Sequence, residues 1–91
     1  MFKVSDGKGF QMTFANGWTV SVQWGVGNYC DHSSARWTEG ANAKVGALGS
    51  TTAEVAAWDA NQVWYQFSTD TVQGYCTPDE VVNFMAMVSA M

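Results

Sequence analysis

Residues 10–24 read FQMTFANGWTVSVQW, and this stretch decides the fold. Apolar and polar residues alternate on both sides of residues 15–17, and a period of two is typical of strands with one buried face. A two-residue turn would set apolar residues opposite polar ones across the hairpin. A three-residue turn pairs Phe14 with Trp18 and places all the apolar side chains on one face. The pattern therefore predicts a hairpin with a three-residue turn, in which Gly17 adopts the left-handed conformation of a G1 bulge.

A second hairpin is predicted further along the chain. Its strands cover residues 54–58 and 63–67, and the turn between them at 59–62 contains Asp and Asn, which are turn-forming residues. Both faces of the second of these strands carry aromatic residues, so we expect it to be covered on both sides. A short strand at residues 71–75 follows. Residues 43–48 alternate weakly and are a candidate for one more short strand.

The end of the chain carries the signals of a helix. Thr77 is a suitable N-cap, Pro78 follows at the first helical position, and Glu80 completes a capping box with Thr77. One apolar stripe at helical spacing should pack on the sheet, and it consists of Val81, Phe84, Met85, Val88 and Met91. The predicted fold is α+β: an antiparallel sheet of about four to five strands, built from two hairpins, with one C-terminal helix on one face.

Composition limits the classes to which the protein can belong. The 91 residues carry a net charge of −4, and 13% are charged, 47% hydrophobic and 14% aromatic. This length predicts a single domain over residues 1–91, and the apolar content is too high for a disordered chain. The few scattered basic residues give no surface for direct nucleic-acid binding, and no apolar run is long enough to span a membrane. Without a signal-peptide pattern at the start, we expect a cytoplasmic protein.

The reactive residues form no recognisable catalytic group. Without an export signal, Cys30 and Cys76 are better interpreted as two free thiols than as a disulfide. A zinc site would require Cys30, His32, Cys76 and a carboxylate to converge, and their spacing is not that of a structural zinc site. Cys76 precedes the predicted helix, where a lowered thiol pKa would make it reactive. We expect no cofactor, no metal and no enzymatic activity, while a disulfide or metal-bound state of the two cysteines stays open.

Residues that favour recognition gather in the irregular stretch from 25 to 52. Trp, Tyr and Arg are common in binding hot spots, and this stretch contains Asn28, Tyr29, Asp31, His32, Arg36 and Trp37. We predict these six as binding residues. Trp58 and Trp64 join them because both lie opposite the best core face. The alternative is that Tyr29 and Trp37 fold back as apolar plugs over the sheet.

Part of the chain resembles small uncharacterised proteins encoded by bacteriophages and their bacterial hosts. The resemblance rests on residues 9–25 and 27–30, with a small contribution from residues 57–59. The group has no assigned activity, so it assigns no role to any residue. It implies a short accessory protein in the cytoplasm of the host cell.

Three functions are compatible with these observations. The first is a non-enzymatic binding protein that acts by protein–protein interaction, either on a host protein that it inhibits or with copies of itself in a homo-oligomer. The second is an oligomeric protein that binds or sequesters a nucleotide-like small molecule, with a base stacked on Trp or Tyr. The third is a weakly acidic mimic of nucleic acid, for which a net charge of −4 is modest support.

Overall fold

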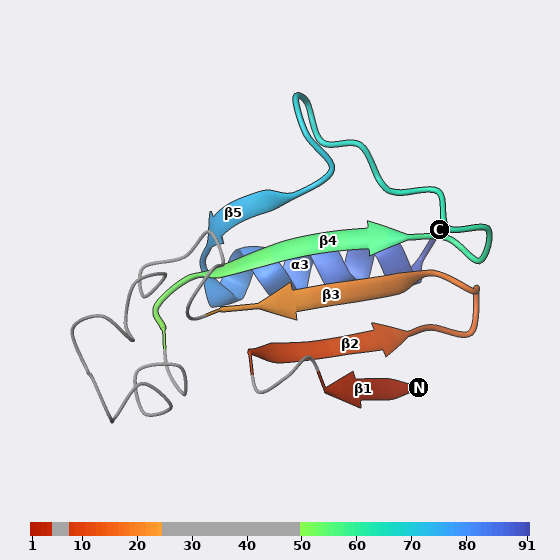
Figure 1. Ribbon diagram of the computed structural model, residues 1–91, viewed down its shortest axis with the longest axis horizontal. Helices are drawn as coiled ribbons and strands as arrows, with labels where there is room; N and C mark the ends of the chain where they lie inside the picture. Colours follow the sequence, from red (N-terminus) through yellow and green to blue (C-terminus); the bar gives the residue numbers. More distant parts are fainter. Residues whose placement is uncertain (5–7, 25–49) are drawn as a thin grey trace.

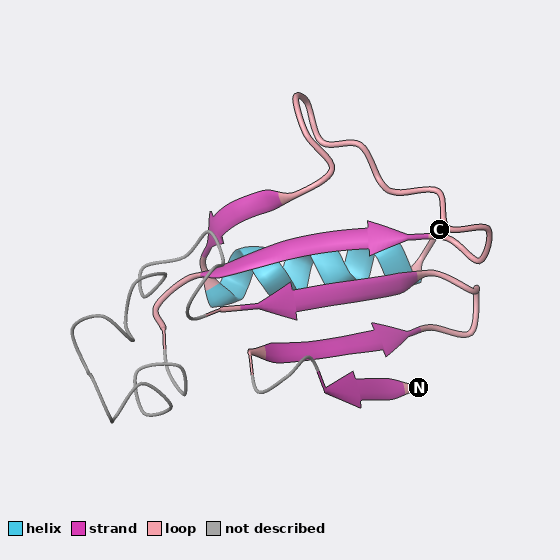
Figure 2. Ribbon diagram, viewed as in Figure 1, coloured by secondary structure: helices cyan, strands magenta, loops and turns pink. Residues whose placement is uncertain are grey.

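The computed structural model describes residues 1–4, 8–24 and 50–91, and five strands of these residues form one antiparallel sheet (Figure 1). The sheet order is β1-β2-β3-β4-β5, so sequential strands lie side by side. A helix near the C-terminus lies across one face (Figure 2). The elements are β1 (Phe2–Val4), β2 (Gly9–Thr13), β3 (Thr19–Gln23), β4 (Ala53–Trp58), β5 (Gln73–Cys76) and α3 (Pro78–Ser89). The predicted α+β class is confirmed.

The β2–β3 hairpin forms in the predicted register. Met12 pairs with Val20, as a three-residue turn requires. The Gly17 N–H donates to the Phe14 carbonyl oxygen at 3.0 Å, and the Phe14 N–H donates to the Trp18 carbonyl oxygen at 2.8 Å. Gly17 has a φ of 89°, a conformation that costs little only in glycine. The turn thus sends all the apolar side chains of the hairpin to one face.

The core lies between that face and α3. It is built mainly from small side chains of β3, β4 and the helix, namely Val20, Val22, Ala53, Val55, Ala57, Cys76, Val81 and Val88. Their size lets the helix approach the sheet closely. α3 contacts β3, β4 and β5 but neither β1 nor β2. One half of the helix-side face is therefore covered by α3, and the other half is not.

The helix begins as predicted and ends earlier than predicted. The Glu80 N–H donates to Thr77 Oγ1 at 3.3 Å, and the Thr77 N–H donates to Glu80 Oε1 at 2.9 Å, which together form a capping box. Val81 and Val88 are buried. Including Met91 in the buried stripe was wrong, because the helix stops at Ser89 and Met91 is half exposed beyond it.

The prediction of a strand at residues 63–67 was wrong. The turn before it forms, and the Asp59 carboxylate accepts two backbone N–H bonds across it. The chain then makes one isolated bridge, Trp58–Trp64, and leaves the sheet. The aromatic rings explain why: Tyr65 and Phe67 lie 5.6 and 5.2 Å from the Phe84 ring of α3. The contacts of Tyr65 and Phe67 with α3 thus take the place of further strand pairing with β4.

The remaining strands differ in position from those expected. β5 begins two residues later than the predicted strand at 71–75 and pairs with the first half of β4. β1 was not predicted, because three residues are too few for a periodic pattern. It pairs with β2, with Phe2 opposite Met12. The candidate strand at 43–48 lies outside the described residues.

The β2–β3 turn also holds the end of the helix, through the side chain of Asn16. Its Nδ2 lies 2.9 Å from the Val88 carbonyl oxygen and 3.2 Å from that of Ser89, and its Oδ1 accepts the Trp18 N–H at 3.0 Å. The last carbonyls of a helix have no partner within it. Asn16 therefore caps α3 from more than 70 residues away in the sequence.

We expect Asn16→Ala to lower the free energy of unfolding by about 1–2 kcal/mol, because it removes several hydrogen bonds of modest net value. Asn16→Asp separates the two roles of the side chain. It keeps the acceptor for Trp18 but loses the donor and places a negative charge at the negative end of the helix dipole. Thermal unfolding followed by circular dichroism should show the aspartate variant at least as destabilised as the alanine variant. A wild-type midpoint for the aspartate variant would contradict the capping role.

Candidate functional site

Most of the predicted binding residues lie outside the described part of the chain. Asn28, Tyr29, Asp31, His32, Arg36 and Trp37 fall between residues 25 and 49, as does Cys30. Their role in binding stays a prediction. The described residues that could form a site are found on three surfaces: a tryptophan pair, an uncovered part of the sheet and an apolar pocket.

Trp58 and Trp64 are brought together on the sheet face opposite α3. Their ring centres lie 4.8 Å apart at an interplanar angle of 33°. Trp58 pairs with Thr19 across the β3–β4 ladder, and the Thr19 hydroxyl lies 2.8 Å from that of Thr13. Trp64 remains 44% exposed. Both residues were expected opposite the core face, and there their two indole rings contact each other.

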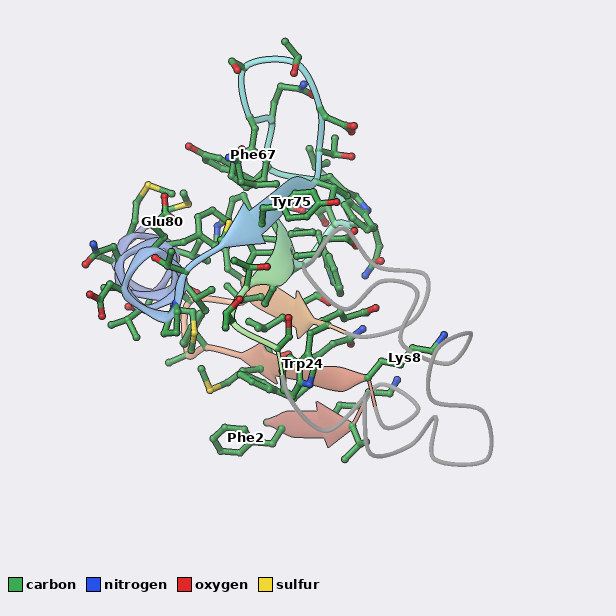
Figure 3. All side chains as sticks on the ribbon, turned by 90° about the vertical axis from the view of Figure 1, so that its left-hand side faces the viewer. Phe2, Lys8, Trp24, Phe67, Tyr75 and Glu80 are labelled. Carbon is green, nitrogen blue, oxygen red and sulfur yellow. The ribbon has the colours of Figure 1, made fainter. Side chains whose placement is uncertain are left out.

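The half of the helix-side face that α3 does not cover is apolar. Residues Phe2, Val4, Phe10 and Met12 alternate along β1 and β2 and point to the side that carries α3. We call these four residues the open half-face. Phe2 is 78% exposed and Val4 75% exposed. Figure 3 shows Phe2 on the helix side of the sheet, beyond the edge of the helix. Exposed apolar area of this kind marks interaction sites on soluble proteins.

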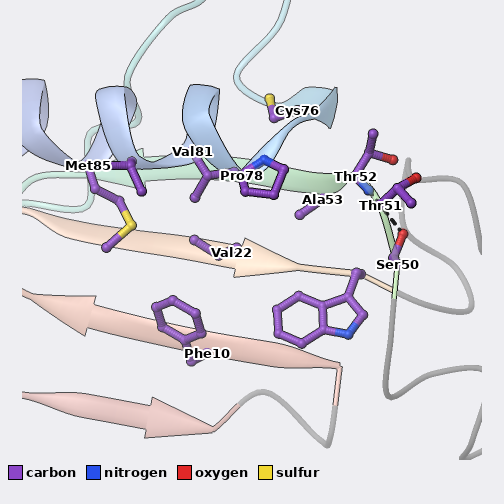
Figure 4. Close-up of a pocket in the computed structure, with 12 residues that line it drawn as sticks. Phe10, Val22, Ser50, Thr51, Thr52, Ala53, Cys76, Pro78, Val81 and Met85 are labelled. Carbon is purple, nitrogen blue, oxygen red and sulfur yellow. Dashed lines mark hydrogen bonds between the residues drawn. The ribbon is translucent and has the colours of Figure 1, made fainter.

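An apolar pocket of about 370 Å³ lies where the open half-face meets the start of α3 (Figure 4). The described residues that line it are Phe10, Val22, Trp24, Ser50, Thr51, Thr52, Ala53, Cys76, Pro78, Val81, Val82 and Met85. None of these side chains is charged. Its hydroxyl groups gather at one end, at residues 50–52. The volume is within the range of small-molecule sites, about 300–1,000 Å³.

Cys76 in the pocket wall does not have the environment of a reactive cysteine. It is 6% exposed, and its Sγ lies 3.6 Å from the Gln73 carbonyl oxygen. Burial raises the pKa of the Cys76 thiol, and the nearby Glu80 carboxylate raises it further. The position of Cys76 before the helix therefore does not lower its pKa, in line with the interpretation of this cysteine as an unreactive thiol. Glu80, placed there by the capping box, brings a negative charge that opposes the dipole.

Two further chemical features can be examined in the described residues. Within them, no three His, Cys, Asp or Glu side chains are grouped so that they could hold a metal ion. No helix among them is long and apolar enough to cross a membrane. Cys30 and His32, which a zinc site would need, lie in the part of the chain that is not described.

No protein-family model matches the chain, and neither a curated protein nor a solved structure matches it. The arrangement of side chains is thus the basis for a functional argument. Sequence reasoning missed Phe2 and Val4. The alternation of Phe2-Lys3-Val4, opposite the apolar residues of the next strand, was the available signal.

We expect Cys76 to react slowly with iodoacetamide at neutral pH, with the rate rising as pH passes above the thiol's ordinary pKa of 9.0. A Cys30→Ser background isolates this thiol. Because folding raises the pKa, the neutral thiol stabilises the fold below pH 9.0, and that stability is lost as pH rises through the folded pKa.

Glu80→Gln should increase the alkylation rate of Cys76 near pH 8, because it removes a negative charge and keeps a capping side chain. Asp79→Asn is the matched control, since it removes a neighbouring charge that does not raise this pKa. Equal rates in the two variants would contradict the assigned cause.

Proposed function

We propose that this chain is a non-enzymatic binding protein that acts by protein–protein interaction through the open half-face. The observation that carries the proposal is that, among the described residues, α3 contacts only β3 to β5, while the same apolar sheet face continues over β1 and β2, with Phe2 and Val4 exposed and Phe10 and Met12 half-buried. A partner bound to this surface would cover the part of the sheet face that α3 leaves exposed. Burying it from water is favourable at about 25 cal/mol per Å² of apolar area.

The half-face has the composition of an interface centre. Aromatic and methionine side chains are enriched in protein interfaces, whereas charged residues are depleted at their centres. The open half-face contains two phenylalanines and one methionine, namely Phe2, Phe10 and Met12. None of its four side chains is charged. The exposed Val82 of α3 continues the apolar surface on the helix side.

Two kinds of partner fit this surface. One is a second copy of the chain, packed face to face in a homo-oligomer. The other is a host protein, and the resemblance to small phage-encoded proteins supports that partner and an inhibitory role. The nucleic-acid mimic is less well supported, because the described carboxylates are spread over β4, two loops and the start of α3.

The pocket supports a second candidate function, binding of a small molecule. A nucleotide-like ligand fits poorly, since no charged side chain among the described lining residues would meet a phosphate. The lining instead suits a neutral, mostly apolar molecule with one polar end near the hydroxyls of Ser50 and Thr52. Phe10 of β2 and Trp24, which directly follows β3, offer aromatic contact to this ligand.

The half-face is tested by Phe2→Ser/Val4→Ser, which replaces two exposed side chains and should leave the fold intact. We expect wild type to self-associate at tens of micromolar in sedimentation equilibrium and the double variant to associate at least tenfold more weakly. Val63→Ser is the matched control, because Val63 is 60% exposed in a loop outside this surface.

A second measurement covers a host partner. Wild type and both variants are used to capture proteins from a host lysate, with the bound proteins quantified by mass spectrometry. A monomeric wild type whose captured proteins are unaffected by the Phe2→Ser/Val4→Ser changes would contradict the proposed use of the half-face.

The pocket is tested with N-phenyl-1-naphthylamine, a neutral apolar dye whose fluorescence rises on burial. We expect saturable binding by wild type, binding at least tenfold weaker in Met85→Trp, which fills the pocket, and no competition by AMP. Val63→Trp is the control that adds the same indole away from the pocket. Equal dye binding by both tryptophan variants would contradict the pocket as the site.

A further inference from the structure

β1 is an edge strand, and among the described residues no strand lies beyond it. An edge strand presents a row of backbone donors and acceptors with which another chain can pair.

The hydrogen bonds of Met1 determine which backbone groups β1 presents at this edge. The Met1 nitrogen donates to the Thr13 carbonyl oxygen at 3.0 Å, and the Thr13 N–H donates to the Met1 carbonyl oxygen at 2.8 Å. Bonded and non-bonded pairs alternate along an antiparallel ladder. Lys3 is therefore the next residue bonded to β2, and the N–H and C=O groups of Phe2 and Val4 point outward from the sheet.

The side chains of β1 alternate between the two faces of the sheet. Phe2 and Val4 lie on the helix-side face within the open half-face, so Lys3 lies on the opposite face. A strand added at this edge would place alternate residues beside the two apolar side chains and the residue between them beside Lys3.

The charge of this edge differs from that of the chain as a whole. The net charge is −4, yet both lysines of the described residues, Lys3 and Lys8, lie in or next to β1 and β2, and both are exposed. The described carboxylates all lie in β4 or later in the sequence. Among the residues that the structure describes, this edge is therefore basic and apolar, and it is complementary to an acidic strand.

We propose that the partner of this chain contributes an extended segment, with an acidic residue between two apolar residues, that pairs with β1 as a sixth strand. This inference rests on the proposed function and specifies its partner. The outward groups of Phe2 and Val4 hold the backbone of the segment, its apolar residues extend the open half-face, and its carboxylate lies beside Lys3.

A second copy of the chain is a poor occupant of this edge. The two-fold register that uses all the outward groups pairs Phe2 of one copy with Val4 of the other, and it sets Lys3 opposite Lys3. Like charges directly opposite each other destabilise a strand pair. A short edge strand with a central lysine is a feature by which proteins prevent pairing between copies. Face-to-face association through the half-face leaves this edge unpaired.

The test uses two capped heptapeptides that differ in one residue, one with a Val-Glu-Val centre and one with a Val-Lys-Val centre. Nuclear magnetic resonance titration reports the amides of Phe2 and Val4 and gives the affinities. We expect the glutamate peptide to shift both amides and to bind wild type on the order of fivefold more tightly, from the energy of one cross-strand charge pair. Lys3→Glu should reverse the preference.

Val4→Pro tests the backbone contact. Proline is accepted at an edge strand where the N–H faces solvent, so this variant should fold but lose binding of both peptides. The inference is overturned if neither peptide shifts the two amides at millimolar concentration. It is also overturned if the preference survives Lys3→Glu, or if wild type alone protects these amides by pairing with a second copy. Failure here with an intact effect of Phe2→Ser/Val4→Ser on self-association overturns the strand partner and leaves the half-face as an interface.

Discussion

The three-residue turn at residues 15–17 is the constraint on which the rest of the structure depends. Because Gly17 accepts a φ of 89°, β2 and β3 pair with their apolar residues on one face. A register shifted by one residue would send each apolar side chain of one strand to the opposite face. The same turn carries Asn16, which holds the carbonyls at the end of α3. One turn thus determines both which face is apolar and where the helix ends on it.

The size of a single helix then explains why α3 covers only half of that face. A helix is about 10 Å wide with its side chains, whereas adjacent strands lie about 4.8 Å apart. One helix can therefore cover about two to three strands. α3 lies over β3, β4 and β5, where valine and alanine allow close contact, and Phe84 meets Tyr65 and Phe67. β1 and β2 are not among the strands that α3 contacts closely, although Phe10 and Met12 make their surface as apolar as the rest.

The parts of the fold that could be predicted from sequence are those whose signals are local. The β2–β3 register and the capping box at Thr77 depend on residues within a few positions of each other. The strand expected at 63–67 failed because contacts of Tyr65 and Phe67 with a distant helix outweighed their strand propensity. The helix cap by Asn16 has no local pattern, and the short alternation at Phe2-Lys3-Val4 does not show that α3 leaves this face uncovered, since both features depend on how far α3 extends across the sheet. The tryptophan pair was located on the correct face because period-two alternation fixes the face of Trp58.

The open half-face also links binding to stability. A domain of this size buries a limited share of its surface, and Val20, Val55 and Val88 are the largest fully buried side chains. Such a core leaves the free energy of unfolding small. The apolar area of β1 and β2 that stays in contact with water does not add to that free energy. A partner that binds only the folded chain raises the free energy of unfolding. At a concentration 100 times its Kd, the increase is about 2.7 kcal/mol. On the proposed function, β1 and β2 are the part of the fold that a partner would complete, and Lys3 at the edge would favour a strand with an acidic residue opposite it.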